Sequence, residues 1–176
     1  LEQSERVNKT QVGLAKTIEA QLQKVEAQES MDSRRKLAEL YVEGREWDKA
    51  LENYQRVIEL SGVKDPVVER AMVEIELARY KERIAEWETY LATEGLDDAA
   101  KAEGTSNVAA LKAERRVYLL QSLRDRVKNM PTAYDDRLEL GLMLFEDGAV
   151  DEALNHFQFM QRSPRFVNEG ALYSGK

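Results

Sequence analysis

The sequence carries the same pattern twice, with a constant spacing of 103 residues between the copies. Segments 34–60 and 137–163 align without a gap, and six matched positions hold apolar or small residues in both. These pairs are Leu37/Leu140, Ala38/Gly141, Tyr41/Leu144, Trp47/Val150, Ala50/Ala153 and Tyr54/Phe157. An internal repeat indicates an array of small structural units, so it restricts the possible folds more than any single motif does.

Each copy has the spacing expected of two helices joined by a tight turn. The turns are predicted near Gly44–Arg45 and near Asp147–Gly148, where Gly148 would end the first helix of its pair. The small residues of the two helices are expected to face each other, so that the helices approach closely. Aromatic and leucine side chains then fill the space beside that contact and are removed from water.

This spacing resembles the tetratricopeptide repeat (TPR), whose pattern is a leucine, a small residue and an aromatic three positions later, followed by an alanine and another aromatic. The copies depart from the family at its early tryptophan, where Arg34 and Arg137 stand. The resemblance covers two 34-residue units of the 176-residue chain. It implies an all-α, right-handed superhelical array of helix-turn-helix repeats, at 31–64 and 131–165, whose first helices line a concave groove for a peptide or partner helix.

The two ends are predicted to be helical as well. Residues 1–30 are expected to form an amphipathic capping helix with an apolar stripe of Val7, Leu14, Ile18, Leu22 and Val25. A coiled-coil arm that dimerises or docks a partner is the alternative, although Gln11 and Gln21 stand where a strict heptad needs apolar residues. Because Gly175 follows Gly141 by 34 residues, 166–176 is predicted to be the first helix of a truncated further repeat, and the chain a fragment of a longer array.

The middle segment, 65–130, allows two interpretations. It forms either one elongated hairpin, with 66–93 packed against 107–129, or two degenerate repeats, with a turn near Arg79. "GTSN" at 104–107 is a poor helix interior, which favours the hairpin. Residues 65–106 contain 11 acidic and 5 basic residues, whereas 107–129 contain 2 acidic and 6 basic ones, so the two arms are expected to attract each other.

Little in the sequence indicates catalysis. The chain has no cysteine, and its single histidine, His156, lies in a second helix, where a partly packed or surface position is expected rather than a catalytic base. The carboxylate pairs are expected at loops and first helical turns, where negative charge favours the helix dipole; they are Asp97–Asp98, Asp135–Asp136 and Asp151–Glu152. We therefore expect no enzyme, no metal and no cofactor.

The remaining function is recognition of another protein. A net charge of −7 opposes binding to nucleic acid, no apolar run is long enough for membrane insertion, and the absence of a secretory signal favours the cytoplasm. The TPR resemblance places Arg35, Glu39, Val42, Glu43, Leu138, Leu142, Phe145 and Glu146 in the groove. The prediction is a noncatalytic scaffold for a partner peptide or helix. The alternatives are a self-associating assembly element, a homodimer among them, and the recruiting domain of a larger enzyme. It also remains open whether the neighbouring hairpin covers the apolar trio Leu138, Leu142 and Phe145.

Overall fold

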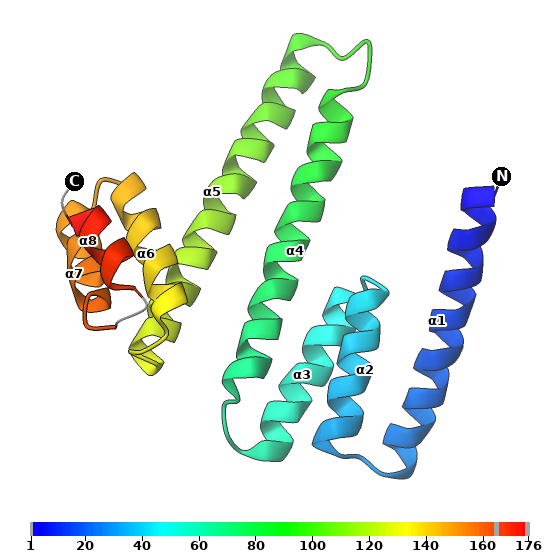
Figure 1. Cartoon of the computed structure of the whole chain (residues 1–176). Coiled ribbons are helices and arrows are strands. Elements are labelled where there is room, and N and C mark those ends of the chain that lie inside the picture. The colour runs from blue at the N-terminus through cyan, green and yellow to red at the C-terminus, as the bar shows by residue number, and fades with distance from the viewer. Residues whose placement is uncertain (1, 164–165, 175–176) are drawn as a thin grey trace. The chain divides into compact units, whose positions relative to one another are not determined.

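A computed structural model describes residues 2–163 and 166–174, and all the regular structure in these residues is helical (Figure 1). The predicted all-α fold is therefore confirmed. The helices are α1 (Glu2–Ala27), α2 (Met31–Glu43), α3 (Trp47–Ser61), α4 (Pro66–Leu91), α5 (Asp98–Asn129), α6 (Tyr134–Glu146), α7 (Val150–Met160) and α8 (Val167–Ser174). In the described part of the chain, none of them is long and apolar enough to cross a membrane.

The chain divides into two compact units, Leu1–Thr93 and Glu94–Lys176, which are described separately. In the first unit, helices α1 to α4 pack in chain order, each against the next (Figure 1). Polar side chains cap the starts of α2 and α4. Ser30 and Ser33 form a capping box at the start of α2, and Asp65 accepts a hydrogen bond from the Val67 amide at 2.9 Å, one residue after Pro66 opens α4.

The pair α2–α3 forms around the predicted contact of small residues. Ala38 and Ala50 have no exposed surface, and Tyr41 and Tyr54 are buried beside them. The turn between the two helices comes where the repeat pattern places it, at 44–45. Arg45 has a φ of 57°, the left-handed conformation that favours glycine, and it is the one non-glycine residue with positive φ in the described chain.

Helix α1 directs its apolar stripe at α2. Val25 is buried, Leu14 and Ile18 are half-buried, and Leu22 stays 36% exposed. The Val7 side chain lies outside the described part. Gln21, a mismatch in a heptad, is only 7% exposed, and its side-chain amide donates a hydrogen bond to the Ser33 carbonyl at 2.9 Å. An amide that ties α1 to α2 thus occupies a position where a coiled coil would need an apolar side chain.

The second unit repeats the arrangement around α6 and α7. Helix α5 packs against α6, α6 against α7, and α8 against α7. Ala153 and Phe157 of α7 are buried with Leu140 and Leu144 of α6. The turn falls at 147–148 as predicted, with Gly148 at a φ of 78°. Gly175 lies outside the described residues, so its place in a further repeat stays a prediction.

The middle segment differs from the sequence expectation in its helix bounds. Helix α4 continues through Arg79 without a turn, and α5 begins at Asp98 rather than at 107. The "GTSN" stretch lies inside α5, where the Thr105 hydroxyl donates to the Lys101 carbonyl at 2.7 Å. The helix begins before this stretch, where Asp97 accepts a hydrogen bond from the Ala100 amide at 2.7 Å. The region thus forms two long helices. They belong to different units, so their packing as a hairpin stays a prediction.

The basic residues of α5 find partners inside their own unit. Arg116 pairs with Asp147 at 2.7 Å, and Arg124 pairs with Glu152 at 2.9 Å. The acids at the end of α6 and the start of α7 thus take part of the positive charge of α5. The expected attraction between the acidic segment 65–106 and the basic segment 107–129 stays a prediction.

Candidate partner-binding faces

The predicted groove residues lie on two helices, one in each unit. Arg35, Glu39 and Val42 lie on α2, and Leu138, Leu142 and Phe145 lie on α6. The repeat pattern thus placed each set on a first helix of its pair. The geometry of the two sets is given separately below.

On α2, most of the predicted residues already have contacts within the unit. Arg35 forms an ion pair with Asp65 at 2.8 Å, while its buried Nε has no hydrogen-bond partner among the described residues. Val42 is half-buried and packs against the core of the unit. Glu39 is exposed and forms no ion pair with the described residues. Charge on this face therefore remains available to a partner at Glu39 and at Glu43, which is also exposed.

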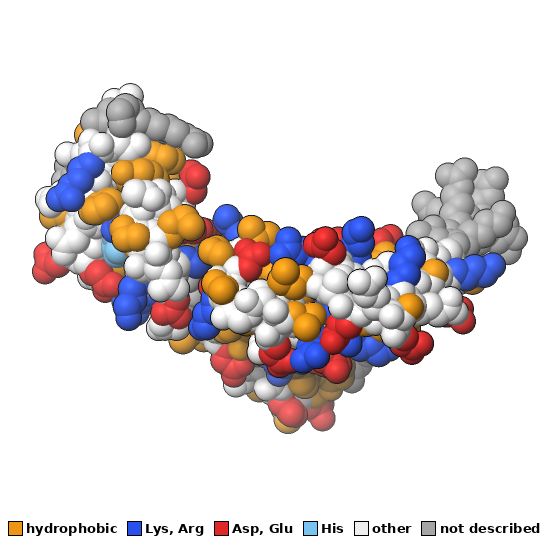
Figure 2. Space-filling view, turned by 90° about the horizontal axis from the view of Figure 1, so that it is seen from below, with side chains coloured by type: hydrophobic (Ala, Val, Ile, Leu, Met, Phe, Trp, Pro, Cys, Tyr) orange, Lys and Arg blue, Asp and Glu red, His pale blue; other side chains and the backbone are white. Residues whose placement is uncertain are grey.

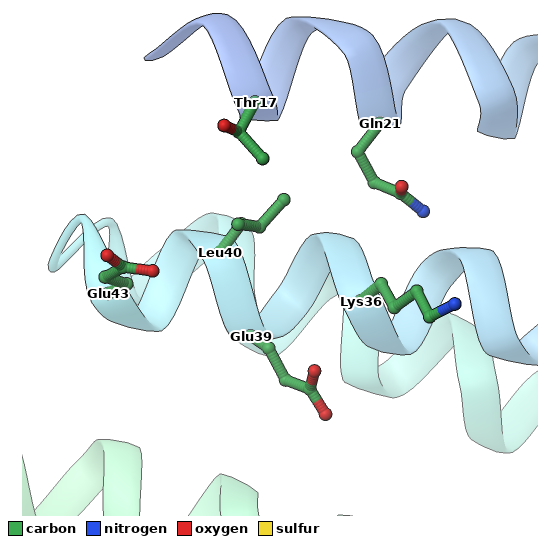
Figure 3. Close-up of a pocket in the computed structure, with 6 residues that line it drawn as sticks. All are labelled: Thr17, Gln21, Lys36, Glu39, Leu40 and Glu43. Atoms are coloured by element: carbon green, nitrogen blue, oxygen red, sulfur yellow. The ribbon is translucent and has the colours of Figure 1, made fainter. Parts of the chain in front are cut away.

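An open pocket of about 330 Å³ lies between α1 and α2 (Figure 3). Thr17 and Gln21 reach from α1 toward α2, and Leu40 rises between them. The complete lining is Thr17, Gln21, Lys36, Glu39, Leu40 and Glu43. Sequence reasoning found Glu39 and Glu43 but missed the residues from α1, because that helix was treated as a cap. The polar Gln21 within the apolar stripe of α1 was the sequence signal that could have identified these residues.

On α6, burial divides the predicted apolar trio. Leu138 and Leu142 are half-buried and pack against the core cluster, which also contains Leu123 of α5. Phe145 is 39% exposed. Figure 2 shows hydrophobic side chains standing among charged ones over the C-terminal helices, at the left of the view. Leu138 and Leu142 are therefore partly covered within their own unit, and Phe145 is the member with the most open surface.

The end of α6 is held to α5 by a cluster of charges. The Arg116 guanidinium donates to the Met143 carbonyl at 3.0 Å and to Glu146 at 3.2 Å, in addition to its pair with Asp147. These acceptors raise the pKa of Arg116, with Asp147 as the largest cause. The cluster fixes the helix turn that carries Phe145, and Glu146, a predicted groove residue, is already engaged in it.

A buried arginine beside His156 was not anticipated as a functional feature. Arg137 is 8% exposed, and one of its terminal nitrogens lies 3.2 Å from His156 Nδ1. Its Nε and other terminal nitrogen donate to the Pro131 carbonyl at 3.3 and 2.9 Å, and its guanidinium lies 3.9 Å from the centre of the Phe159 ring. The sequence showed Arg137 only as a departure from the family pattern, since contacts between helices leave no periodic signal.

The carboxylate pairs lie where the sequence predicted. Asp97 caps α5, Asp135 and Asp136 lie in the first turn of α6, and Asp151 and Glu152 lie in the first turn of α7. Within the described residues, no group of three or more histidine, aspartate or glutamate side chains is placed to hold a metal ion. These acids therefore have a structural explanation at helix N-termini.

Comparison with known proteins gives a likeness in structure but none in sequence. No family model matches the sequence, and no curated protein matches it. Among solved structures, the chain is similar to YrrB, described as a TPR protein with an unusual peptide-binding site, at 20% identity and a TM-score of 0.43 over 90% of this chain and 81% of that one. The chain's own features define its fold: two matched segments, each folded as two helices around a contact of small residues, make it an all-α, TPR-like helical repeat protein.

Proposed function

We propose that the chain is a noncatalytic scaffold that binds a peptide or helix of another protein on its first-helix faces. The observation that carries the proposal is Phe145, an aromatic side chain 39% exposed on α6, beside the half-buried Leu138 and Leu142. Aromatic side chains on a rigid surface are frequent anchors of binding energy because they bury a large area at little conformational cost.

The proposed mechanism separates affinity from orientation. A partner's apolar side chains would cover Phe145 and the open edges of the two leucines, which removes apolar surface from water. On α2, Arg35, Glu39 and Val42 would form a second contact, in which the unpaired Glu39 sets orientation rather than affinity. The firm attachment of α6 to α5 through Arg116 supports this mechanism, because a preorganised face loses little entropy on binding.

The test is affinity capture from a lysate of the source cells, with three versions of the purified chain. Phe145→Asp should lose the partner, because it places a charge where apolar contact is needed. Val150→Asp is the matched control, since Val150 is also an exposed apolar residue, at 50%, but lies on α7. All three versions should melt at the same temperature. Leu142→Asp is a less direct probe, because Leu142 packs against the core.

The outcomes separate the alternatives. A protein that is captured by the wild type and by Val150→Asp, but not by Phe145→Asp, supports binding on α6. Equal recovery with all three versions contradicts it. If no partner is recovered and sedimentation instead gives a dimer that becomes monomeric when residues 1–30 are removed, self-association through α1 replaces the proposal.

A further inference from the structure

The two repeats contain the same hydrogen bond between their first and second helices. In the first unit, Arg34 of α2 donates to the side-chain oxygen of Asn53 of α3 at 3.0 Å. In the second unit, Arg137 of α6 lies 3.2 Å from Nδ1 of His156 of α7. The arginines occupy matched positions, and so do their acceptors, with the 103-residue spacing of the repeat. One inter-helix link is therefore built twice, with two different acceptors.

The acceptors differ in their response to protons. A guanidinium group has only donors, so Nδ1 of His156 must present a lone pair, and the neutral ring must carry its proton on Nε2. Protonation of the imidazole would place an N–H group and a positive charge against Arg137, and the bond could not survive. The Asn53 amide does not titrate, so the bond in the first unit has no such sensitivity.

The charges around Arg34 and Arg137 also differ, and this difference too makes the link in the second unit the more sensitive to protonation. Arg34 also donates from its Nε to Glu29 at 2.8 Å. Hydrogen bonds from Arg56 and Arg34 lower the pKa of Glu29 to about 2, so this carboxylate remains ionised through the neutral range. The other partners of Arg137 are neutral, namely the Pro131 carbonyl and the Phe159 ring. A positive charge on His156 would thus meet no direct counterion on Arg137 among the described residues, and Arg162, over the same Phe159 ring at 4.8 Å, already adds positive charge there.

The groups around His156 act mostly against its protonation. Burial is the largest cause of a lowered pKa for His156, and Arg137 of α6 and Arg124 of α5 add to it, while Glu152 on its own helix opposes them. Glu152 is itself paired with Arg124 at 2.9 Å. From α8, the uncharged Tyr173 packs on the neighbouring Phe157. The environment therefore suits the neutral ring.

We propose that the Arg137–His156 pair is a pH-sensitive link that holds α6 to α7 above neutral pH and releases them on acidification, whereas the Arg34–Asn53 link holds at both pH values. Because folding lowers the pKa of His156, its contribution to stability is complete above the unfolded value of about 6.5. That contribution is lost as the pH falls from there through the lower, folded value. The proposal does not depend on the proposed binding function.

The test is segment-resolved hydrogen exchange of the full chain at pH 7.5 and 5.5, corrected for intrinsic exchange rates. In the wild type, protection of α6 and α7 should fall at pH 5.5 by up to about tenfold, while α2 and α3 change little. His156→Asn gives the second unit the acceptor of the first and should remove most of the fall. Asn53→His is the converse variant and should make α2 and α3 sensitive to pH.

Two results would overturn the proposal. One is an equal pH-dependent fall in α6 and α7 for the wild type and for His156→Asn. The other comes from nitrogen NMR of the imidazole: a ring protonated at Nδ1 at pH 7.5 would rule out the bond, whatever the stability of the variants. A lone pair on Nδ1, lost together with protection as the pH falls, would support it.

Discussion

At the residue scale, Gly141 shows why a helix interior contains a glycine. A Cβ atom built on Gly141 would lie 2.5 Å from Cε1 of Phe157, closer than real side chains approach. The Phe157 ring is almost completely buried, so it has little freedom to move away. The weak helix propensity of glycine is accepted at this position because the aromatic ring occupies the space of a side chain.

Gly141→Ala is therefore expected to destabilise the protein although alanine is the better helix former. Overpacking against Phe157 should lower the free energy of unfolding by about 1–3 kcal/mol, measured by urea denaturation. Gly13→Ala in α1 is the matched control, since no described atom beyond the adjacent residues and the backbone of its own helix lies within 4 Å of the added Cβ there. This control should be neutral or stabilise by up to about 1 kcal/mol. Equal behaviour of the two variants would contradict the contact with Phe157.

At the element scale, the link between α5 and α6 gives a second prediction. Arg116→Gln should speed hydrogen exchange at the end of α6, because it removes the ion pair with Asp147 and weakens the bond to the Met143 carbonyl. The side chain of Arg116 is 38% exposed, so the loss should be about 1 kcal/mol or less, and smaller in high salt.

Arg115→Gln is the control for this link. Arg115 is the neighbouring residue on α5 and makes no ion pair with the described residues. Exchange at residues 143–146 should remain as in the wild type. If the two variants loosen α6 equally, the effect comes from the general charge of α5 and not from the specific bonds of Arg116.

The elements also show what could be predicted from the sequence. The matched positions around Leu37 and Leu140 predicted both helix pairs and both turns, because residues buried along one face of a helix give a periodic apolar pattern in the sequence. The start of α5 was not predicted, since "GTSN" has low helix propensity and the compensating bonds of Asp97 and Thr105 are local. The partial burial of Leu142 and the bond of Arg137 to His156 depend on how helices pack against one another, and a single sequence does not record that.

At the scale of the whole molecule, the chain consists of two units, each with its own buried core. The connection between them, 92–97, is not helical, and residues 92–95 are exposed. A protease that cuts after glutamate should therefore cleave first at Glu94 under native conditions, as mass spectrometry of the early fragments would show. Earlier cleavage within α4 or α5 would mean that the long helices open before the connection does.

The left-handed turn residue has a consequence for how the two copies could be exchanged. Arg45 at a φ of 57° and Gly148 at 78° occupy matched positions, although only glycine adopts this conformation without strain. The same turn therefore forms with either residue, which indicates that the helices on both sides impose it. The two turns should therefore be exchangeable: a chimera that carries either turn in both copies should keep its helix pairs. The turns are for this reason suitable places to graft a foreign loop.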